Sequence, residues 1–176
     1  VFEDAQVVHN LGVGAAIEET LVEVWSTVFE DNLRQGLVLG AGSSGAIEMS
    51  RFANNDGLRL ENTGALTVRG SRFENAILGF ESQSSAPRIQ GNFFVNNSTA
   101  LRLSGTAVPL EISGNIFERN RLAALENLSS LSLNAVDNYW GTTDSTEIAA
   151  LIKGEVEWAP FLDQEPGAGA VLEVSS

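Results

Sequence analysis

The stretch that decides the fold is Ser50-Arg-Phe-Ala-Asn-Asn55, because its pattern returns along the chain. Each copy reads small polar residue, any residue, Phe, any two residues, Asn. The other copies are residues 27–32, 71–76 (which end in Ala76), 92–97 and 115–120. We interpret residues 1–4 as an earlier copy and Asn138-Tyr-Trp-Gly141 as the terminal one. Similarity at a fixed period indicates a repeat architecture.

The aromatic residues of these copies give the period. They are Phe2, Phe29, Phe52, Phe73, Phe94, Phe117 and Trp140, with spacings of 27, 23, 21, 21, 23 and 23 residues. A period of this size fits either leucine-rich repeats or a parallel β-helix. Leucine-rich repeats usually return through a helix, but no helical apolar spacing occurs before residue 145. Short alternating runs dominate instead, and alternation is the period of strands.

Each repeat contains three such runs, so we expect three short strands in every coil and three parallel sheets around one core. The sequence thus predicts an all-β chain, a right-handed parallel β-helix of about six coils spaced roughly 4.8 Å apart. We expect the Phe residues to point inward as one column. The residues five positions before each Phe form a second inward column. That second column is Val24, Ile47, Val68, Ile89 and Ile112.

The Asn residues that close the copies fall at a turn, where stacked amides can satisfy backbone groups. They are Asn32, Asn55, Asn97 and Asn120. Because Ala76 takes this place in one coil, we expect the Asn ladder to break once.

A C-terminal cap is the one place with a helical pattern. Residues 144–154 have Asp144 or Ser145 as N-cap, Ile148, Leu151 and Ile152 as apolar face, and Gly154 as end. We expect this helix to cover the end of the core, beside Trp140, Trp158 and Phe161. The predicted organisation is solenoid 1–137, cap 138–163, and linker with strand-like tail 164–176.

Composition narrows the partners. There are 10 basic and 23 acidic residues and a net charge of −13, which argues against nucleic acid or an anionic membrane surface. Cysteine is absent, which excludes disulfides and thiolate chemistry. No apolar run is long enough to span a membrane. Since residues 1–4 already form a coil phrase, either further residues precede them or this end meets another molecule.

The recurring Asn-x-Phe-x-x-Asn coils, followed by Asn138-Tyr-Trp-Gly141 and Trp158-Ala-Pro-Phe-Leu162, resemble the pectate-lyase-like right-handed β-helix superfamily. More narrowly, they resemble exported bacterial and archaeal β-helix repeat proteins whose solenoid ends with an Asn-Tyr-Trp-Gly phrase. The resemblance covers residues 1 to about 162 and is specific for fold. It leaves function open, because this fold carries lyases, hydrolases, epimerases, adhesins and inert scaffolds.

The best outward cluster of ionisable residues is Arg59, Glu61, Glu81 and Arg102, on successive strands of one run. It is either a ligand site or a surface charge ladder with mutual compensation, and we favour the ladder. Glu48 with Arg69 and Arg88 with Glu111 are expected cross-coil pairs. A stripe of Glu3, Glu30, Glu74 and Glu118 follows the Phe anchors. It is either a calcium site or a solvated acidic face, and the gaps at Ala53 and Val95 favour the solvated face. His9 is the only histidine, and we expect it to be structural or exposed rather than catalytic.

Two hypotheses follow for function. The leading one is a non-catalytic structural module of the cell exterior, surface-bound or filament-forming, whose partner is a second copy of itself. Assembly would use the tail residues Val171, Leu172 and Val174 or the open N-terminal end. The alternative is a β-helix that binds or degrades polysaccharide, for which fold analogy is the support. We expect no catalytic residues and no cofactor, with calcium as the one ion to consider.

Overall fold

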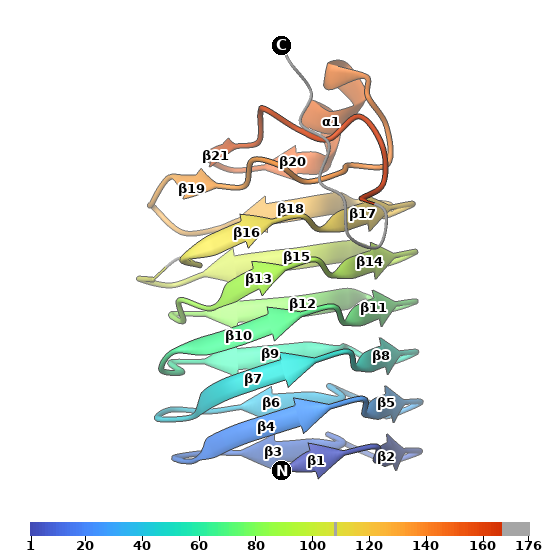
Figure 1. Cartoon of the computed structure of the whole chain (residues 1–176), viewed down its shortest axis with the longest axis vertical. Helices are drawn as coiled ribbons and strands as arrows, with labels where there is room; N and C mark the ends of the chain where they lie inside the picture. The colour runs from blue at the N-terminus through green and yellow to red at the C-terminus, as the bar shows by residue number, and fades with distance from the viewer. Residues whose placement is uncertain (108, 167–176) are drawn as a thin grey trace.

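The computed structural model describes residues 1–107 and 109–166. The chain winds as a right-handed solenoid in which each coil contributes one strand to each of three parallel sheets, and the coils rise from the N-terminus to the C-terminal cap (Figure 1). The predicted fold class is confirmed. The tail residues Val171, Leu172 and Val174 lie outside the described part of the chain.

We name the sheets A, B and C and number the coils 1 to 6 from the N-terminus. Sheet A consists of β1 (Phe2–Glu3), β4 (Leu21–Trp25), β7 (Ser44–Glu48), β10 (Leu66–Arg69), β13 (Arg88–Gln90) and β16 (Glu111–Ser113). Sheet B consists of β2 (Gln6–Val8), β5 (Val28–Glu30), β8 (Arg51–Ala53), β11 (Arg72–Glu74), β14 (Phe93–Val95) and β17 (Ile116–Glu118). Sheet C consists of β3 (Ala15–Ile17), β6 (Leu37–Leu39), β9 (Leu58–Glu61), β12 (Leu78–Gln83), β15 (Thr99–Ser104), β18 (Ala123–Asn127) and β20 (Ile152–Lys153).

The core contains both predicted inward columns. From Phe29 to Phe117 the rings of successive sheet B strands stack with centroids 4.7 to 5.0 Å apart. Trp140 continues the column at 4.7 Å from Phe117. The sheet A column is also buried and in register, coil on coil: Val24, Ile47, Val68, Ile89 and Ile112. One coil repeat therefore places the same apolar side chain at the same point in every layer.

The first member of the aromatic column was predicted wrongly. Phe2 lies on β1 in sheet A, where it pairs with Val24, so it extends the second column. Val7 takes the place below Phe29 in sheet B. The step from Val7 to Phe29 is an ordinary coil, and the apparent 27-residue first repeat came from choosing the wrong anchor.

The Asn ladder lies inside the turn between sheets B and C. The Asn97 Nδ2 donates to the Phe73 carbonyl at 3.0 Å and to Asn120 Oδ1 at 3.2 Å. At Ala76 the ladder breaks as predicted, although the Ala76 N–H still donates to Asn97 Oδ1. The break is longer than the single step we expected, because Asn55 Oδ1 turns to its own coil and accepts from the Gly57 N–H at 2.7 Å.

A second ladder, which we did not predict, runs between sheets A and B through the small polar residue of each copy. Its members are Thr27, Ser50, Ser71, Asn92, Asn115 and Asn138, all buried. From Thr27 to Asn115, each backbone N–H donates to the side-chain oxygen of the next member, for example Asn92 N to Asn115 Oδ1 at 2.9 Å. Two corners of the coil are thus held by side chains that satisfy the turn backbone.

The cap begins as predicted and ends differently. In α1 (Ser145–Leu151), Asp144 is the N-cap and accepts from the Thr146 and Glu147 N–H groups. The helix stops before Ile152 rather than at Gly154, since Ile152 and Lys153 form β20 and pair with β18. Without β20, the outer edge of β18 would expose unpaired backbone groups. Pairing with that edge stabilises residues 152–153 more than another helical turn would. The short strands β19 (Leu133–Asn134) and β21 (Val156–Glu157) pair beside it. In the described residues no helix is long and apolar enough to cross a membrane.

Candidate functional site

The predicted cluster on sheet C is brought together as one outward row. Arg59, Glu81 and Arg102 are direct neighbours on β9, β12 and β15, and Glu126 on β18 continues the row. Glu61 lies two residues along β9 from Arg59 on the same face. The row therefore alternates in charge from coil to coil.

Ion pairs use these charges locally. Arg59 Nε lies 2.6 Å from Glu61 Oε1 and 3.5 Å from Glu81 Oε2, although the Nε–H is not aimed well enough for a hydrogen bond. Arg102 pairs with Glu126 at 2.7 Å rather than with Glu81. This geometry is what a compensated charge ladder requires, and each pair contributes at most about 1 kcal/mol at a solvated surface.

Sheet A carries the two cross-coil pairs that the sequence predicted. Arg69 Nε lies 3.0 Å from Glu48, and Arg88 lies 3.0 Å from Glu111. The pKa of Glu111 is below its ordinary value, because hydrogen bonds from Ser113, Gln90 and Arg88 outweigh the effect of burial.

The acidic stripe is only partly real. Glu30, Glu74 and Glu118 share one row of sheet B, with Ala53 and Val95 between them. Glu3 does not belong to it, because β1 lies in sheet A and Glu3 pairs with Trp25. The stripe was drawn from the residue after each Phe, so it failed where Phe2 was misassigned.

Arginine neutralises the middle of this stripe. Arg51 reaches Glu30 at 2.9 Å and Glu74 at 2.7 Å, and Arg72 reaches Glu74 at 2.6 Å. Burial alone would raise the pKa of Glu74, but the hydrogen bonds from Arg72 and Arg51 prevail and hold it below its ordinary value. Glu74 is therefore an ionised structural carboxylate at neutral pH.

The described residues, 1–107 and 109–166, do not support a metal site. No group of three or more His, Asp or Glu lies in a metal-holding arrangement there. His9 is largely exposed, with Nδ1 3.7 Å from Asp31 Oδ2. Calcium therefore stays a prediction from sequence without a described site.

Sequence reasoning missed a groove along the corner between sheets B and C, which we call the corner groove. Its upper part, of about 400 Å³, is lined by Asn75, Ala76, Ile77, Asn96, Arg119 and Arg121. Its lower part, of about 280 Å³, is lined by Asn32, Leu33, Asn54, Asn55, Asp56 and the same Asn75, Ala76 and Ile77. The shared residues make the two parts continuous across several coils.

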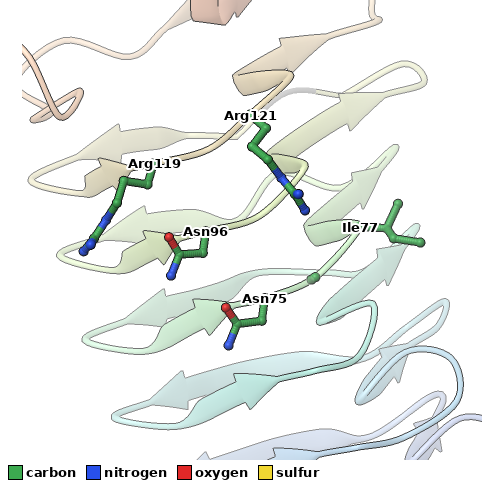
Figure 2. A pocket seen from close by; sticks show the side chains of 6 residues that line it. Asn75, Ile77, Asn96, Arg119 and Arg121 are labelled. Atoms are coloured by element: carbon green, nitrogen blue, oxygen red, sulfur yellow. The ribbon is translucent and has the colours of Figure 1, made fainter.

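The turn geometry builds one wall of this groove. The residue before each inner Asn or Ala76 has positive φ and faces outward, one per coil: Asp31, Asn54, Asn75, Asn96 and Arg119. Asn and Asp tolerate this conformation best, which explains their frequency here. Figure 2 shows Asn75, Asn96 and Arg119 rising along this wall, with Ile77 across the groove and Arg121 descending between them.

The repeated phrase contained a signal for this wall, since Asn or Asp precedes the last position of most copies. We treated that position as variable, and the depth of the groove depends on how the turns of successive coils are arranged in space. The groove exposes side-chain amides and guanidinium groups, which suit hydroxyl, carboxylate and peptide partners.

Comparisons with known proteins extend the repeat assignment. The family described as "Right handed beta helix region" matches residues 1–140. No curated protein and no solved structure matches the chain. The matched span contains the six strands of sheet A and the six strands of sheet B, and it reaches Trp140 of the aromatic column.

Proposed function

Because the chain belongs to the right-handed β-helix family, we propose that it is a non-catalytic structural module of the cell exterior that acts by self-assembly. One observation carries the non-catalytic, structural part of the proposal: seven of its arginines lie within ion-pair distance of a carboxylate, most of them in an adjacent coil. Carboxylates held in this way stabilise a rod. They are poorly placed to act as a general acid or base, which needs a pKa near the working pH.

The resemblance to exported β-helix repeat proteins supports the place at the cell exterior. The strongly acidic composition supports a soluble, monodisperse starting material for assembly rather than attachment to anionic polymers. Assembly through the tail residues Val171, Leu172 and Val174 stays a prediction outside the described residues.

Light scattering across a concentration series tests this function. We expect the mean mass of the purified chain to rise above that of one chain, and negative-stain electron microscopy to show rods or paired rods. A mass that stays at one chain up to millimolar concentration contradicts self-assembly.

The alternative is polysaccharide binding or degradation, and the corner groove is the feature that favours it. Its amides and the Arg121 guanidinium are donors that match sugar hydroxyls and uronate carboxylates. A screen against neutral and acidic polysaccharides, with and without calcium, separates the two functions. Product release in that screen would replace the structural proposal with an enzymatic one.

A further inference from the structure

We infer that the corner between sheets B and C, whose side chains flank the corner groove, is a self-complementary face that packs against the same corner of a second copy, turned antiparallel about a two-fold axis near Ile77. The inference rests on the proposed function and names the surface and the partner. It follows from how charged and apolar side chains are distributed along the corner.

The two ends of the corner differ in charge. The lower coils carry Asp31 and Asp56, partly offset by the exposed Arg34. The upper coil, coil 6, carries Arg119 and Arg121, next to Glu118. Coils 2 and 6 are separated by roughly 19 Å at about 4.8 Å a step, so the polarity extends along most of the solenoid.

Local pairing leaves this polarity partly unmet. Asp31 accepts from Asn54 Nδ2 at 3.0 Å and lies 3.7 Å from His9 Nδ1, and Arg119 lies 3.0 Å from Glu118. Arg121 is exposed and forms no ion pair with any described residue, unlike the arginines of the three sheets. At the basic end of the corner the Arg121 guanidinium thus lacks a carboxylate among the described residues, whereas each arginine of the sheet rows has one.

The corner also presents exposed aliphatic side chains. Ile77, at its middle, is 77% exposed, and Leu33, in the same coil as Asp31, is 73% exposed. Between them the wall presents Asn54 and Asn75, which can donate and accept hydrogen bonds at once. An interface with an apolar centre, amides around it and charges at the ends has the usual anatomy of a protein contact.

A two-fold operation makes this pattern match itself. An antiparallel copy brings the Arg119 and Arg121 end of one chain over the Asp31 and Asp56 end of the other, twice. The same rotation leaves Ile77 close to the axis, facing the Ile77 region of its mate. Such a contact is isologous, so it closes into a dimer rather than growing without limit.

The contact is small, so we expect a weak dimer. Stable interfaces bury about 1,200 Å² or more in total. A contact along a single corner of the coil buries less area than that. The net charge of −13 on each chain also opposes association. Measurements belong at about 0.15 M salt, where charges more than about 8 Å apart are screened.

Charge reversal and mixing test the inference by analytical ultracentrifugation of the full chain. Arg119→Asp with Arg121→Asp makes both ends of the corner acidic, and Asp31→Arg with Asp56→Arg makes both basic. We expect each double variant alone to dimerise at least tenfold more weakly than the parent. An equimolar mixture of the two should recover a heterodimer, because opposite charges then meet at both ends.

The control keeps the change in charge and moves it to another face. Arg69→Asp with Arg88→Asp reverses the same number of arginines on sheet A, and we expect it to dimerise like the parent. Circular dichroism of every variant shows that the solenoid is intact. Recovery in the mixture is informative even if one variant is less stable.

The outcomes distinguish this inference from the proposed function. If the parent associates but the corner variants associate equally well, self-assembly stands and the corner is the wrong face. If the parent is a monomer throughout, both fail. If the parent stays a monomer and an oligogalacturonate perturbs the NMR amide signals of Asn75 and Asn96, the corner groove is a glycan site and the inference is overturned.

Discussion

Filling the gap in the Asn ladder should stabilise the protein. In coil 5, Asn97 donates to the Phe73 carbonyl at 3.0 Å, and its Oδ1 accepts from the Ala76 N–H at 3.1 Å. Ala76→Asn recreates that arrangement one coil lower, with Nδ2 directed at the Phe52 carbonyl and Oδ1 at the Asn55 N–H. On the sheet B side coils 3 and 4 pair in register as coils 4 and 5 do, so the Phe52 carbonyl and the Asn55 N–H lie below Ala76 as the Phe73 carbonyl and the Ala76 N–H lie below Asn97.

The gain is set by two hydrogen bonds, each worth about 0.5 to 1.5 kcal/mol net, less the entropy of fixing one amide side chain. We expect about 1 to 2 kcal/mol of added stability, and a rise in melting temperature of about 2 to 4 °C per kcal/mol for a chain of this size. Urea unfolding followed by circular dichroism and tryptophan fluorescence measures it.

Two further variants bracket this result. Ile77→Asn adds the same side chain at the neighbouring exposed position and should change stability by no more than about 0.5 kcal/mol. Asn97→Ala removes the existing rung and should cost about 1 to 3 kcal/mol, because it leaves buried backbone groups unpaired. If Ala76→Asn destabilises the chain while Asn97→Ala is neutral, the ladder does not hold the turn and our reasoning is wrong.

Four other outcomes can be checked. Phe73→Ala should cost about 3 to 5 kcal/mol in urea unfolding, whereas Phe93→Ala, on a half-exposed residue, should cost far less; equal costs would refute the aromatic column. Glu74→Gln should lower stability at pH 7 by about 1 to 2 kcal/mol, with the difference shrinking as pH falls below the ordinary pKa of 4.5, since the carboxylate then takes up a proton first in the unfolded parent and, below its lowered pKa, in the folded parent as well. A pH-independent difference would show that the Arg72 and Arg51 bonds do not act through charge. Glu81→Gln should leave any polysaccharide-degrading activity intact, and its loss in that assay would favour the enzymatic alternative. Deletion of residues 165–176 should reduce assembly in light scattering if the tail is a connector, and unchanged assembly would exclude it.

The sequence predicts the solenoid well because one residue type recurs at one structural position. Phe at a fixed place in each coil can only stack if the coils superimpose, and residues 27–140 obey that rule throughout. The same reliance on Phe caused the error at the first coil. Residues 5–10 read Ala-Gln-Val-Val-His-Asn, which is the repeated phrase with Val7 in place of Phe. A search for any large apolar residue before Asn10 would have found it.

Other features depend on tertiary context that a sequence pattern does not contain. The residues at the end of the predicted helix have helical spacing, and only the open edge of β18 turns Ile152 into a strand residue. The corner groove depends on turns whose lengths differ from coil to coil. The turn from Asn55 to Leu58 in coil 3 is shorter than the turn from Ala76 to Phe80 in coil 4. The charged cluster on sheet C could be predicted because residues at the same position of successive repeats become direct neighbours in a parallel sheet.

The sheets and the corner use polar side chains in different ways, and this difference is the argument for where a partner binds. On sheets A, B and C an arginine in one coil meets a carboxylate in the next, so the surface charge is satisfied within the chain. At the corner the positive-φ residues stand one above another and are mostly uncharged amides, as where Asn54 donates to Asp31 at 3.0 Å. Amides carry no net charge that could compensate a guanidinium, and Arg121 is left without a carboxylate among the described residues. A surface whose charges are met internally gains little from a partner, whereas a corner whose acidic and basic ends lie several coils apart gains from one that runs the opposite way.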